Sequence, residues 1–335
     1  MRHANVAMFI PHNGCPNKCS FCDQRYITGL KHQVNEKEVR DILNRAKKDL
    51  KGKQDNSEIA FFGGSFTAID RDYMLSLLNV AFEFVKDGSF SGIRISTRPD
   101  AIDREILDIL KEKGVSSIEL GAQSMDDNVL LLNDRGHTVD DVINSSNLVK
   151  EYKFSLGLQM MTGLYGSNFD KDLKTAESII KLSPDTVRVY PTIIMENTFL
   201  AELYRSNKYK TYSLEESIEL CAKILRMFRK NKIEVIRLGL HDTETMKENI
   251  VSGPWHPAFR ELCESQILFE DVMDYINLNN IFFKDIVLYV NPSCVSKFIG
   301  QKRGNIIKFS NAGYYVKVKG DRSIKINDFK LEKGR

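Results

Sequence analysis

The chain has 335 residues, of which 42% are hydrophobic and 28% are charged, as in ordinary globular proteins. No apolar run reaches the ~18–20 residues that a membrane-spanning helix needs. Six cysteines are too few for the disulfide framework of a small secreted domain. We therefore expect a protein of the reducing cytoplasm that has no membrane segment.

The formal net charge of +3 is unevenly distributed along the chain. From Asp285 to Arg335 there are 11 Lys and Arg residues against 4 Asp and Glu, which gives +7 and leaves −4 for residues 1–284. Such a basic segment indicates a separate module. The expected parts are a core at 1–240, a helical extension at 241–284 and a small basic domain at 285–335.

Strand-like and helix-like segments alternate through the first two thirds of the chain. Asn35 followed by Glu38 predicts a capping box at a helix start, and Asp103 predicts another start. The predicted strands are Asn5–Ile10, Glu58–Phe62, Ile93–Thr97, Ser117–Gly121, Phe154–Met160, Thr186–Tyr190 and Ile233–Leu238. This alternation predicts an α/β fold with a parallel sheet, a partial (β/α)6-type TIM barrel whose site lies at the carboxyl ends of the strands.

The pattern changes after about Leu240. Residues His241–Phe283 are predicted to be helical and loop-like. Short strands are then predicted at Ile286–Val290, Ile306–Phe309 and Tyr314–Val318, with a turn at Asn311–Gly313. The C-terminal part is therefore expected to be a small basic α+β domain.

Three cysteines near the N-terminus, Cys15, Cys19 and Cys22, have the spacing C-x3-C-x2-C. Three thiolates this close together suit a [4Fe–4S] cluster in which one iron has no protein ligand. A structural zinc site would need four Cys or His ligands. The remaining cysteines are isolated, although His12 could be a fourth ligand, so the cluster is the favoured prediction and zinc the alternative.

The cysteine spacing resembles that of the radical S-adenosylmethionine (SAM) superfamily. The resemblance implies a partial TIM barrel in which SAM chelates the open iron through its amino and carboxylate groups. It also implies that Phe21 shields the cluster and packs near the adenine, unless it only anchors the loop. A small external one-electron donor, such as flavodoxin or ferredoxin, would reduce the cluster, and a 5′-deoxyadenosyl radical would then abstract hydrogen from the substrate.

Polar residues at the ends of the second and third strands are candidate SAM ligands. Gly63 and Gly64, followed by Ser65, allow close approach of a ligand to the backbone. The resemblance implies that this turn binds the SAM amino group, and a simple tight turn is the alternative. At the next strand end, Ser96 takes the place of an acidic ribose ligand, and Arg98 would suit a carboxylate.

The later strand ends add further candidates. Gln123 can donate to and accept from a ribose, and Arg135, twelve residues later, can pair with the methionyl carboxylate. Oxygen-independent coproporphyrinogen oxidases, which are more distant relatives, hold SAM with a Gln and an Arg at this separation. Gln159 would contact the cofactor. Tyr190 and Arg188 are the candidate catalytic residues, although Tyr190 is equally compatible with simple packing.

A more specific resemblance covers roughly residues 1–240, which look like the radical-SAM domain of the Elongator catalytic subunit. The matching stretches are Ser96–Asp100, Leu120–Ser124, Asn133–His137, Gln159–Met161, Tyr190–Thr192 and Tyr209–Ser213. Elongator enzymes use a further acetyltransferase domain to modify a wobble uridine of tRNA. We expect no such domain here, and therefore not that product.

The stretch Phe298–Ile306 resembles the glycine loop of KH domains, which clamps a nucleic-acid backbone. Its register is imperfect, because the second glycine stands one position later than in that loop. The predicted RNA-binding residues are Gly300, Lys302, Arg303, Gly304 and Lys308. A solvated basic face without a ligand is the alternative.

We thus predict a radical SAM enzyme that cleaves SAM reductively at a [4Fe–4S] cluster and modifies an RNA, either tRNA or rRNA. One alternative is a radical SAM enzyme that acts on a small molecule or a peptide. The other is a non-catalytic iron–sulfur protein that binds RNA.

Overall fold

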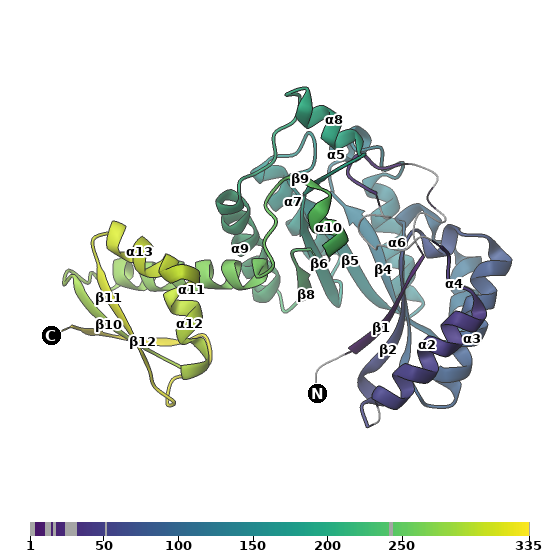
Figure 1. Cartoon of the computed structure of the whole chain (residues 1–335), viewed down its shortest axis with the longest axis horizontal. Helices are drawn as coiled ribbons and strands as arrows, with labels where there is room; N and C mark the ends of the chain where they lie inside the picture. Colours follow the sequence, from purple (N-terminus) through teal and green to yellow (C-terminus); the bar gives the residue numbers. More distant parts are fainter. Residues whose placement is uncertain are drawn as a thin grey trace. The chain divides into compact units, whose positions relative to one another are not determined.

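The chain divides into two compact units (Figure 1). The first comprises Met1–Ser213 and Phe228–Pro254, and the second comprises Leu214–Met227 and Trp255–Arg335. The predicted boundaries at residues 240 and 284 stay predictions. The computed structural model describes residues 4–10, 15, 18–23, 32–50, 52–240 and 244–334. Among these, no helix is both long and apolar enough to cross a membrane.

The first unit is built on one parallel sheet of seven strands. In spatial order these are β1 (Ala4–Ile10), β2 (Ser57–Gly63), β3 (Gly92–Thr97), β4 (Val115–Gln123), β5 (Ser155–Thr162), β6 (Thr186–Pro191) and β8 (Glu234–Leu238). Every neighbouring pair is parallel, so all carboxyl ends lie along one rim. Figure 1 shows the sheet curled with helices on its outside. In the described part of the chain the edge strands β1 and β8 do not pair with each other, so the barrel is open and the predicted partial barrel is confirmed.

The connections between these strands contain helices, which are α2 (Glu36–Asp49), α3 (Arg71–Lys86), α4 (Arg104–Glu112), α5 (Asp127–Leu132), α6 (Val139–Glu151), α7 (Phe169–Lys181) and α8 (Phe199–Arg205). Helix α9 (Leu214–Lys230) belongs to the second unit up to Met227 and to the first unit from Phe228. A short antiparallel pair, β7 (Ile194–Met195) and β9 (Ile250–Ser252), and helix α10 (Glu244–Glu248) complete this part.

Two predicted helix starts are confirmed by their capping hydrogen bonds. At α2, the Glu38 amide donates to Asn35 Oδ1 at 3.0 Å, and the Asn35 amide donates to Glu38 Oε2 at 2.9 Å. At α4, the Ile106 amide donates to Asp103 Oδ1 at 2.8 Å. These bonds satisfy amides that a helix leaves unpaired in its first turn, so neighbouring residues alone determine where the helices begin.

The two faces of the sheet differ in polarity. The outer face buries aliphatic side chains completely, among them Ile59, Ile93, Ile118 and Leu156. Burial of such side chains from water contributes roughly 1.5–3 kcal/mol each to folding. The face opposite to these residues carries polar side chains, which alternate with them along each strand.

A chain of buried ion pairs crosses this inner face from β2 to β6. Glu58 pairs with Arg94 at 2.7 Å, Arg94 with Glu119 at 3.3 Å, and Glu119 with Arg188 at 2.6 Å. Burial alone would raise the pKa of Glu58, but Arg94 and two serine hydroxyls lower it below the usual value. Each charge is therefore compensated by a neighbour of opposite sign, which buried charges require.

The second unit packs helices against one face of a small sheet. Its elements are α11 (Phe259–Leu278), β10 (Asp285–Val290), α12 (Val295–Ile299), α13 (Gly304–Asn311), β11 (Tyr315–Gly320) and β12 (Phe329–Lys333). The sheet order is β11-β10-β12, with β11 parallel and β12 antiparallel to β10. The core residues include Ile286, Leu288, Phe298 and Phe309. The predicted small α+β domain is therefore present.

One secondary-structure prediction in this unit was wrong. Residues Ile306–Phe309, expected to be a strand, lie in helix α13. Helical spacing places Phe309 fully inside the core of the unit, so packing overrides the β propensity of the two isoleucines. The turn at Asn311–Gly313 consequently joins a helix to β11, and Gly313 has φ 85°. Strand β12 was not predicted.

Substitution of Glu119 by alanine should be strongly destabilising, because it leaves Arg94 and Arg188 buried beside each other without their shared carboxylate. We expect a loss of about 3–5 kcal/mol in the free energy of unfolding, measured by urea denaturation of the protein. Glu83→Ala is the matched control, because Glu83 forms an exposed ion pair with Arg40 and should change stability little. Equal effects of the two substitutions would show that the buried ion-pair chain is not important for stability.

Candidate functional site

The cysteine loop after β1 is held by hydrogen bonds to residues far away in the chain. The Ser20 amide donates to Asn133 O at 3.1 Å, and its hydroxyl donates to Asn133 Oδ1 at 2.7 Å. On its other side, the Leu200 amide donates to Ser20 O at 2.8 Å. Asn133 is fully buried, and its amide nitrogen also donates to Tyr165 O at 2.9 Å. The loop is thus fixed between α5 and α8.

The three predicted cluster ligands, Cys15, Cys19 and Cys22, line one cavity of about 170 Å³. Within the described residues, no three His, Cys, Asp or Glu side chains converge closely enough to hold a single metal ion. A [4Fe–4S] cluster does not require such convergence, because each cysteine ligates a different iron. The thiols therefore surround a volume, as cluster ligands do.

The environment of the thiols favours a cationic partner. Burial, followed by the neighbouring Cys19 and Cys15, raises the pKa of Cys22 to about 12. Burial and Cys19 also raise the pKa of Cys15. Thiolates bind metals and neutral thiols do so poorly, so ionising these groups together needs positive charge inside the cavity, which an iron–sulfur cluster would supply.

The glycine turn at the end of β2 forms part of the same cavity. Gly63 has φ 113°, and a Cβ atom there would lie 2.8 Å from Ile10 O. The Gly64 amide donates to that same oxygen at 2.7 Å. The close approach of β1 thus explains Gly63 independently of any ligand. Ser65, also in the cavity wall, accepts a hydrogen bond from the Arg98 amide at 3.0 Å.

Three residues of the cavity wall have buried polar atoms without a partner in the described part of the chain: Arg98 Nη1, Gln123 Oε1 and Arg135 Nε. Arg98 binds Asp100 through its other two nitrogens. Arg135 donates to Cys19 Sγ at 3.0 Å and to Gly121 O at 2.8 Å. Unpartnered buried polar atoms are costly, so these residues fit a polar ligand in the cavity.

Gln123 is additionally in a strained backbone conformation, with φ 65°. The pairing of β4 with β5 shifts register just before it. Non-glycine residues in this region of φ cost stability and gather at functional sites. The Gln123 side chain lines both cavities of the site.

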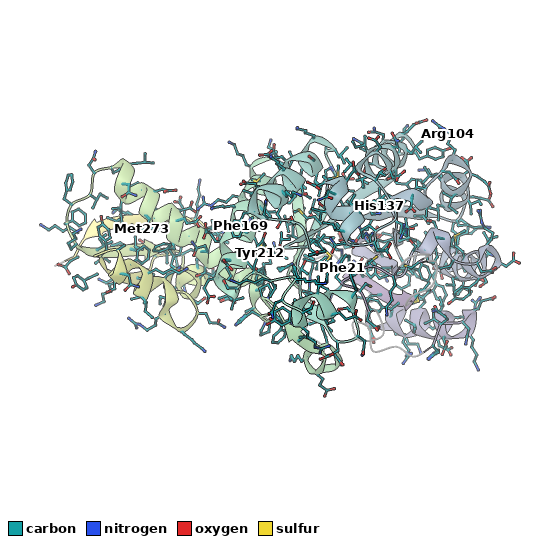
Figure 2. The ribbon with its side chains drawn as sticks, turned by 90° about the horizontal axis from the view of Figure 1, so that it is seen from above. Phe21, Arg104, His137, Phe169, Tyr212 and Met273 are labelled. Atoms are coloured by element: carbon teal, nitrogen blue, oxygen red, sulfur yellow. The ribbon has the colours of Figure 1, made fainter. Side chains whose placement is uncertain are left out.

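A second cavity, of about 230 Å³, adjoins the first and is lined mainly by apolar side chains. Six residues line both cavities: Phe21, Cys22, Gly63, Ser96, Gln123 and Gln159. The Phe21 ring, labelled in Figure 2, lies 6.0 Å from the Arg135 guanidinium. The two cavities together thus offer a polar compartment beside the thiols and an apolar compartment beyond it.

The candidate catalytic residues Arg188 and Tyr190 line the apolar cavity. Glu119 accepts two hydrogen bonds from Arg188, at 2.6 and 2.9 Å, and one from Gln159 at 2.9 Å. The Arg188 guanidinium also lies 5.0 Å from the Phe62 ring centroid. Burial raises the pKa of Tyr190, so its hydroxyl stays protonated at neutral pH and can act as a donor.

Sequence reasoning assigned no role to four residues that support the site: Ser20, Glu119, Asn133 and His137. His137, labelled in Figure 2, is buried, and desolvation together with Arg135 lowers its pKa to about 4. Its ring is therefore neutral at pH 7. Ser20 lies within the cysteine motif and Glu119 within the predicted fourth strand, whereas Asn133 and His137 lie in a stretch that resembles the Elongator domain. These positions were the available signal, but they did not reveal the hydrogen-bond partners of the four residues.

The predicted RNA-binding residues lie in the second unit, where Gly300, Lys302 and Arg303 connect α12 to α13, Gly304 begins α13 and Lys308 lies within it. Gly300 has φ 78°, and a Cβ atom there would lie 2.7 Å from the Asn305 amide nitrogen. Lys302 and Arg303, also at positive φ, expose their side chains. Lys308 instead hydrogen-bonds Gln266, and its ammonium lies 5.6 Å from the Phe269 ring centroid.

Comparisons with known proteins agree with this architecture. Residues 9–179 match the Radical SAM superfamily, and residues 184–268 match the Radical_SAM C-terminal domain. The chain is 26% identical over 281 residues to the tRNA uridine(34) acetyltransferase of Dehalococcoides mccartyi, covering 71% of this chain and 61% of that protein. It is 32% identical over 200 residues to human Elongator complex protein 3, covering 54% of this chain and 37% of that protein.

Solved structures share the fold. Elp3 of the archaeon Methanocaldococcus infernus superimposes with a TM-score of 0.63 at 20% identity, covering 85% of this chain and 65% of that one. SuiB of Streptococcus suis gives 0.51 at 14% identity, covering 73% and 50%. The chain spans less than two thirds of the length of these relatives. Its family match covers more than half of its own length, and the chain belongs to the radical SAM superfamily, whose cofactors are a [4Fe–4S] cluster and SAM.

Proposed function

We propose that Cys15, Cys19 and Cys22 hold a [4Fe–4S] cluster, and that SAM binds beside it to be cleaved reductively. The observation that carries this proposal is the single cavity that contains the three thiols together with unpartnered polar atoms of Arg98 and Arg135. When bound, the cluster and SAM supply reductive cleavage of a carbon–sulfur bond and abstraction of a hydrogen atom from a substrate. The protein orients these groups and excludes water from them.

Individual residues have defined parts in this arrangement. Arg98 and Arg135 compensate the SAM carboxylate, and Gln123 binds its ribose, with Gly63 to Ser65, Ser96 and Gln159 completing the pocket. Phe21 separates the polar cavity from the apolar one, where the substrate group binds. Glu119 holds Arg188 against the apolar cavity. Tyr190 keeps its proton and can donate it to the substrate.

We infer that the substrate is an RNA, and tRNA is the first candidate. Relatives with this core are named tRNA uridine(34) acetyltransferases. The C-terminal module is strongly basic, and Lys302 and Arg303 are exposed on it. Cations of this kind bind phosphates. A cytoplasmic RNA-modifying transferase is the function that these observations support best.

Anaerobic incubation with SAM and dithionite tests the proposed chemistry. The wild-type protein should release 5′-deoxyadenosine, and addition of tRNA from cells that lack the protein should yield a nucleoside absent from the untreated tRNA. Release of 5′-deoxyadenosine without any change in RNA would favour a small-molecule or peptide substrate. Absence of cleavage under both conditions would contradict the proposal.

Cys19→Ala should prevent cluster binding, because the two remaining cysteines supply too few ligands to hold a [4Fe–4S] cluster. We expect iron content and the visible absorption of reconstituted protein to fall to background. Cys294→Ala is the matched control, because Cys294 is a buried cysteine of the second unit, and its loss should leave iron content unchanged. A Cys19 variant with full absorption would remove the basis of the assignment.

Arg135→Gln should weaken binding of SAM to the cluster-loaded protein by about 10- to 100-fold, because a hydrogen bond to a charged group contributes roughly 1.5–3 kcal/mol. Equilibrium dialysis with labelled SAM measures the dissociation constant. Arg104→Gln, which alters an exposed ion pair with Glu151, should leave that constant unchanged. Wild-type affinity in the Arg135 variant would exclude its proposed contact with the carboxylate.

The double substitution Lys302→Ala and Arg303→Ala should weaken tRNA binding. It should also reduce the slope of log affinity against log salt by about one or two, because each lost phosphate contact removes roughly one unit. Filter binding at several salt concentrations measures both effects. Lys37→Ala with Lys48→Ala removes two exposed lysines of α2 and serves as the control of equal charge. Identical slopes for the two double variants would argue against the glycine loop as an RNA site.

A further inference from the structure

The small sheet of the second unit has one covered face and one open face. On the covered face, Ile286, Leu288 and Val290 of β10 share an apolar core with α11, α12 and α13. Side chains alternate between the two faces of a strand, so the intervening residues point to the other face. These are Asp285, Val287 and Tyr289 of β10, Tyr315, Lys317 and Lys319 of β11, and Lys330 and Glu332 of β12. We call this surface the open sheet face.

The strand register makes the open sheet face continuous. Tyr289 pairs with Lys319 of β11 on one side and with Lys330 of β12 on the other. Two positions earlier, Val287 pairs with Lys317 in the same parallel ladder. Neighbouring strands lie about 4.8 Å apart, and the Lys319 ammonium is 5.7 Å from the Tyr289 ring centroid. A half-buried aromatic ring thus has a lysine on each side.

A second ring, Tyr315, lies at the other end of the open sheet face. It is 68% exposed and pairs with Asp285. Tyr315 precedes Lys319, the partner of Tyr289, by four residues. A strand rises about 3.3 Å per residue, so the two rings are separated by roughly 13 Å along the strand. Lys317 lies halfway along this interval, and both it and Lys319 are exposed.

Two rings with ammonium groups between them match the chemistry of a single-stranded nucleic acid. Each nucleotide combines a flat base, which stacks on an aromatic ring, with a phosphate, which attracts a cation. Two acidic residues share the face. Glu332 is compensated by Lys330 at 2.8 Å, and Asp285 lies at the first position of β10. Lys317 and Lys319 are therefore the cations that can meet phosphates.

We propose that the open sheet face binds single-stranded RNA, with one base stacked on Tyr289 and another on Tyr315. The phosphates between them lie beside Lys317 and Lys319. The proposal rests on the proposed function for the class of substrate and adds a surface that holds it. The surface is separate from the glycine loop, because that loop connects α12 to α13, which pack against the covered face. A loop or an end of tRNA fits it, and a paired stem does not.

Two structural explanations of the same residues make different predictions. Tyrosine is common in strands because it fits a pleated surface, which accounts for either ring alone. Lysines on edge strands keep sheets from joining edge to edge, and β11 and β12 are the edges of this sheet within the described residues. Neither explanation requires that loss of a ring or a lysine weaken RNA binding, so substitutions separate them from the proposal.

Fluorescence anisotropy of a short labelled oligouridylate, titrated with cluster-loaded protein, tests the two rings. Tyr315→Ala and Tyr289→Leu should each weaken binding about 10- to 100-fold, because each removes one stacking surface. Tyr289→Phe keeps a ring and should match the wild type. Phe282→Ala is the control, since it removes an 83% exposed ring outside the sheet. Tyr315 is too exposed for its loss to open a core, so its variant tests the proposal even if Tyr289→Leu does not fold.

The lysines are tested through the salt dependence of the same binding. Lys317→Ala with Lys319→Ala should lower the slope of log affinity against log salt by about 1.4, because each phosphate contact of a single strand contributes roughly 0.7. Lys37→Ala with Lys48→Ala, on α2, is the control of equal charge. A duplex RNA of equal length should bind more weakly and should not respond to the tyrosine variants, since paired bases cannot stack on the rings.

Wild-type affinity of both tyrosine variants for oligouridylate, or equal weakening of duplex binding, would overturn the proposal. An unchanged slope together with self-association of the lysine variant would assign the lysines to protection of the sheet edges. Failure of the proposed function gives a different result. A wild-type protein that binds oligouridylate through Tyr289 and Tyr315 but leaves tRNA unmodified would contradict the RNA substrate and not the binding surface. Modification of tRNA by a protein that does not bind oligouridylate would overturn the surface alone.

Discussion

Thiolates buried beside one another repel, and at Cys22 this repulsion adds to the cost of burial and raises its pKa to about 12. The fold nevertheless brings three such groups to one cavity and places Arg135 against Cys19. An arrangement that is unfavourable for ionised thiols alone becomes favourable when a cationic iron–sulfur group is bound. This need to compensate buried negative charge explains the rest of the site, because the cavity walls must hold the cysteine loop in place and also supply positive charge beside the thiolates.

The protein holds the loop and the pocket by two different means. Ser20 and the fully buried Asn133 tie the loop to α5 through neutral hydrogen bonds. The pocket floor depends on charge, because Glu119 compensates Arg94 on one side and Arg188 on the other. The hydrogen bonds of Ser20 and Asn133 attach only the loop, whereas the ion pairs of Glu119 belong to the sheet. A substitution of Asn133 or Glu119 would therefore alter the cavity although neither residue is a cofactor ligand.

Much of the architecture could be predicted because its signals are local. The strand ranges, the capping box at Asn35 and the N-cap at Asp103 depend on neighbouring residues and on periodicity. Ile306–Phe309 was predicted wrongly because its β-forming residues are packed as a helix, with Phe309 inside the core of the second unit. Strand β12 was not predicted, because it is defined only by its antiparallel pairing with β10, which lies about forty residues earlier in the chain.

The residues alone determined the cofactor class, since three cysteines at this spacing suit a cluster with an open iron and little else. They also indicated which strand ends would carry polar side chains. Only the tertiary structure showed that Glu119 joins Gln159 to Arg188 and that Asn133 fixes the cysteine loop. These relations connect residues far apart in sequence through single contacts. A contact of that kind leaves no periodic or compositional trace in the chain.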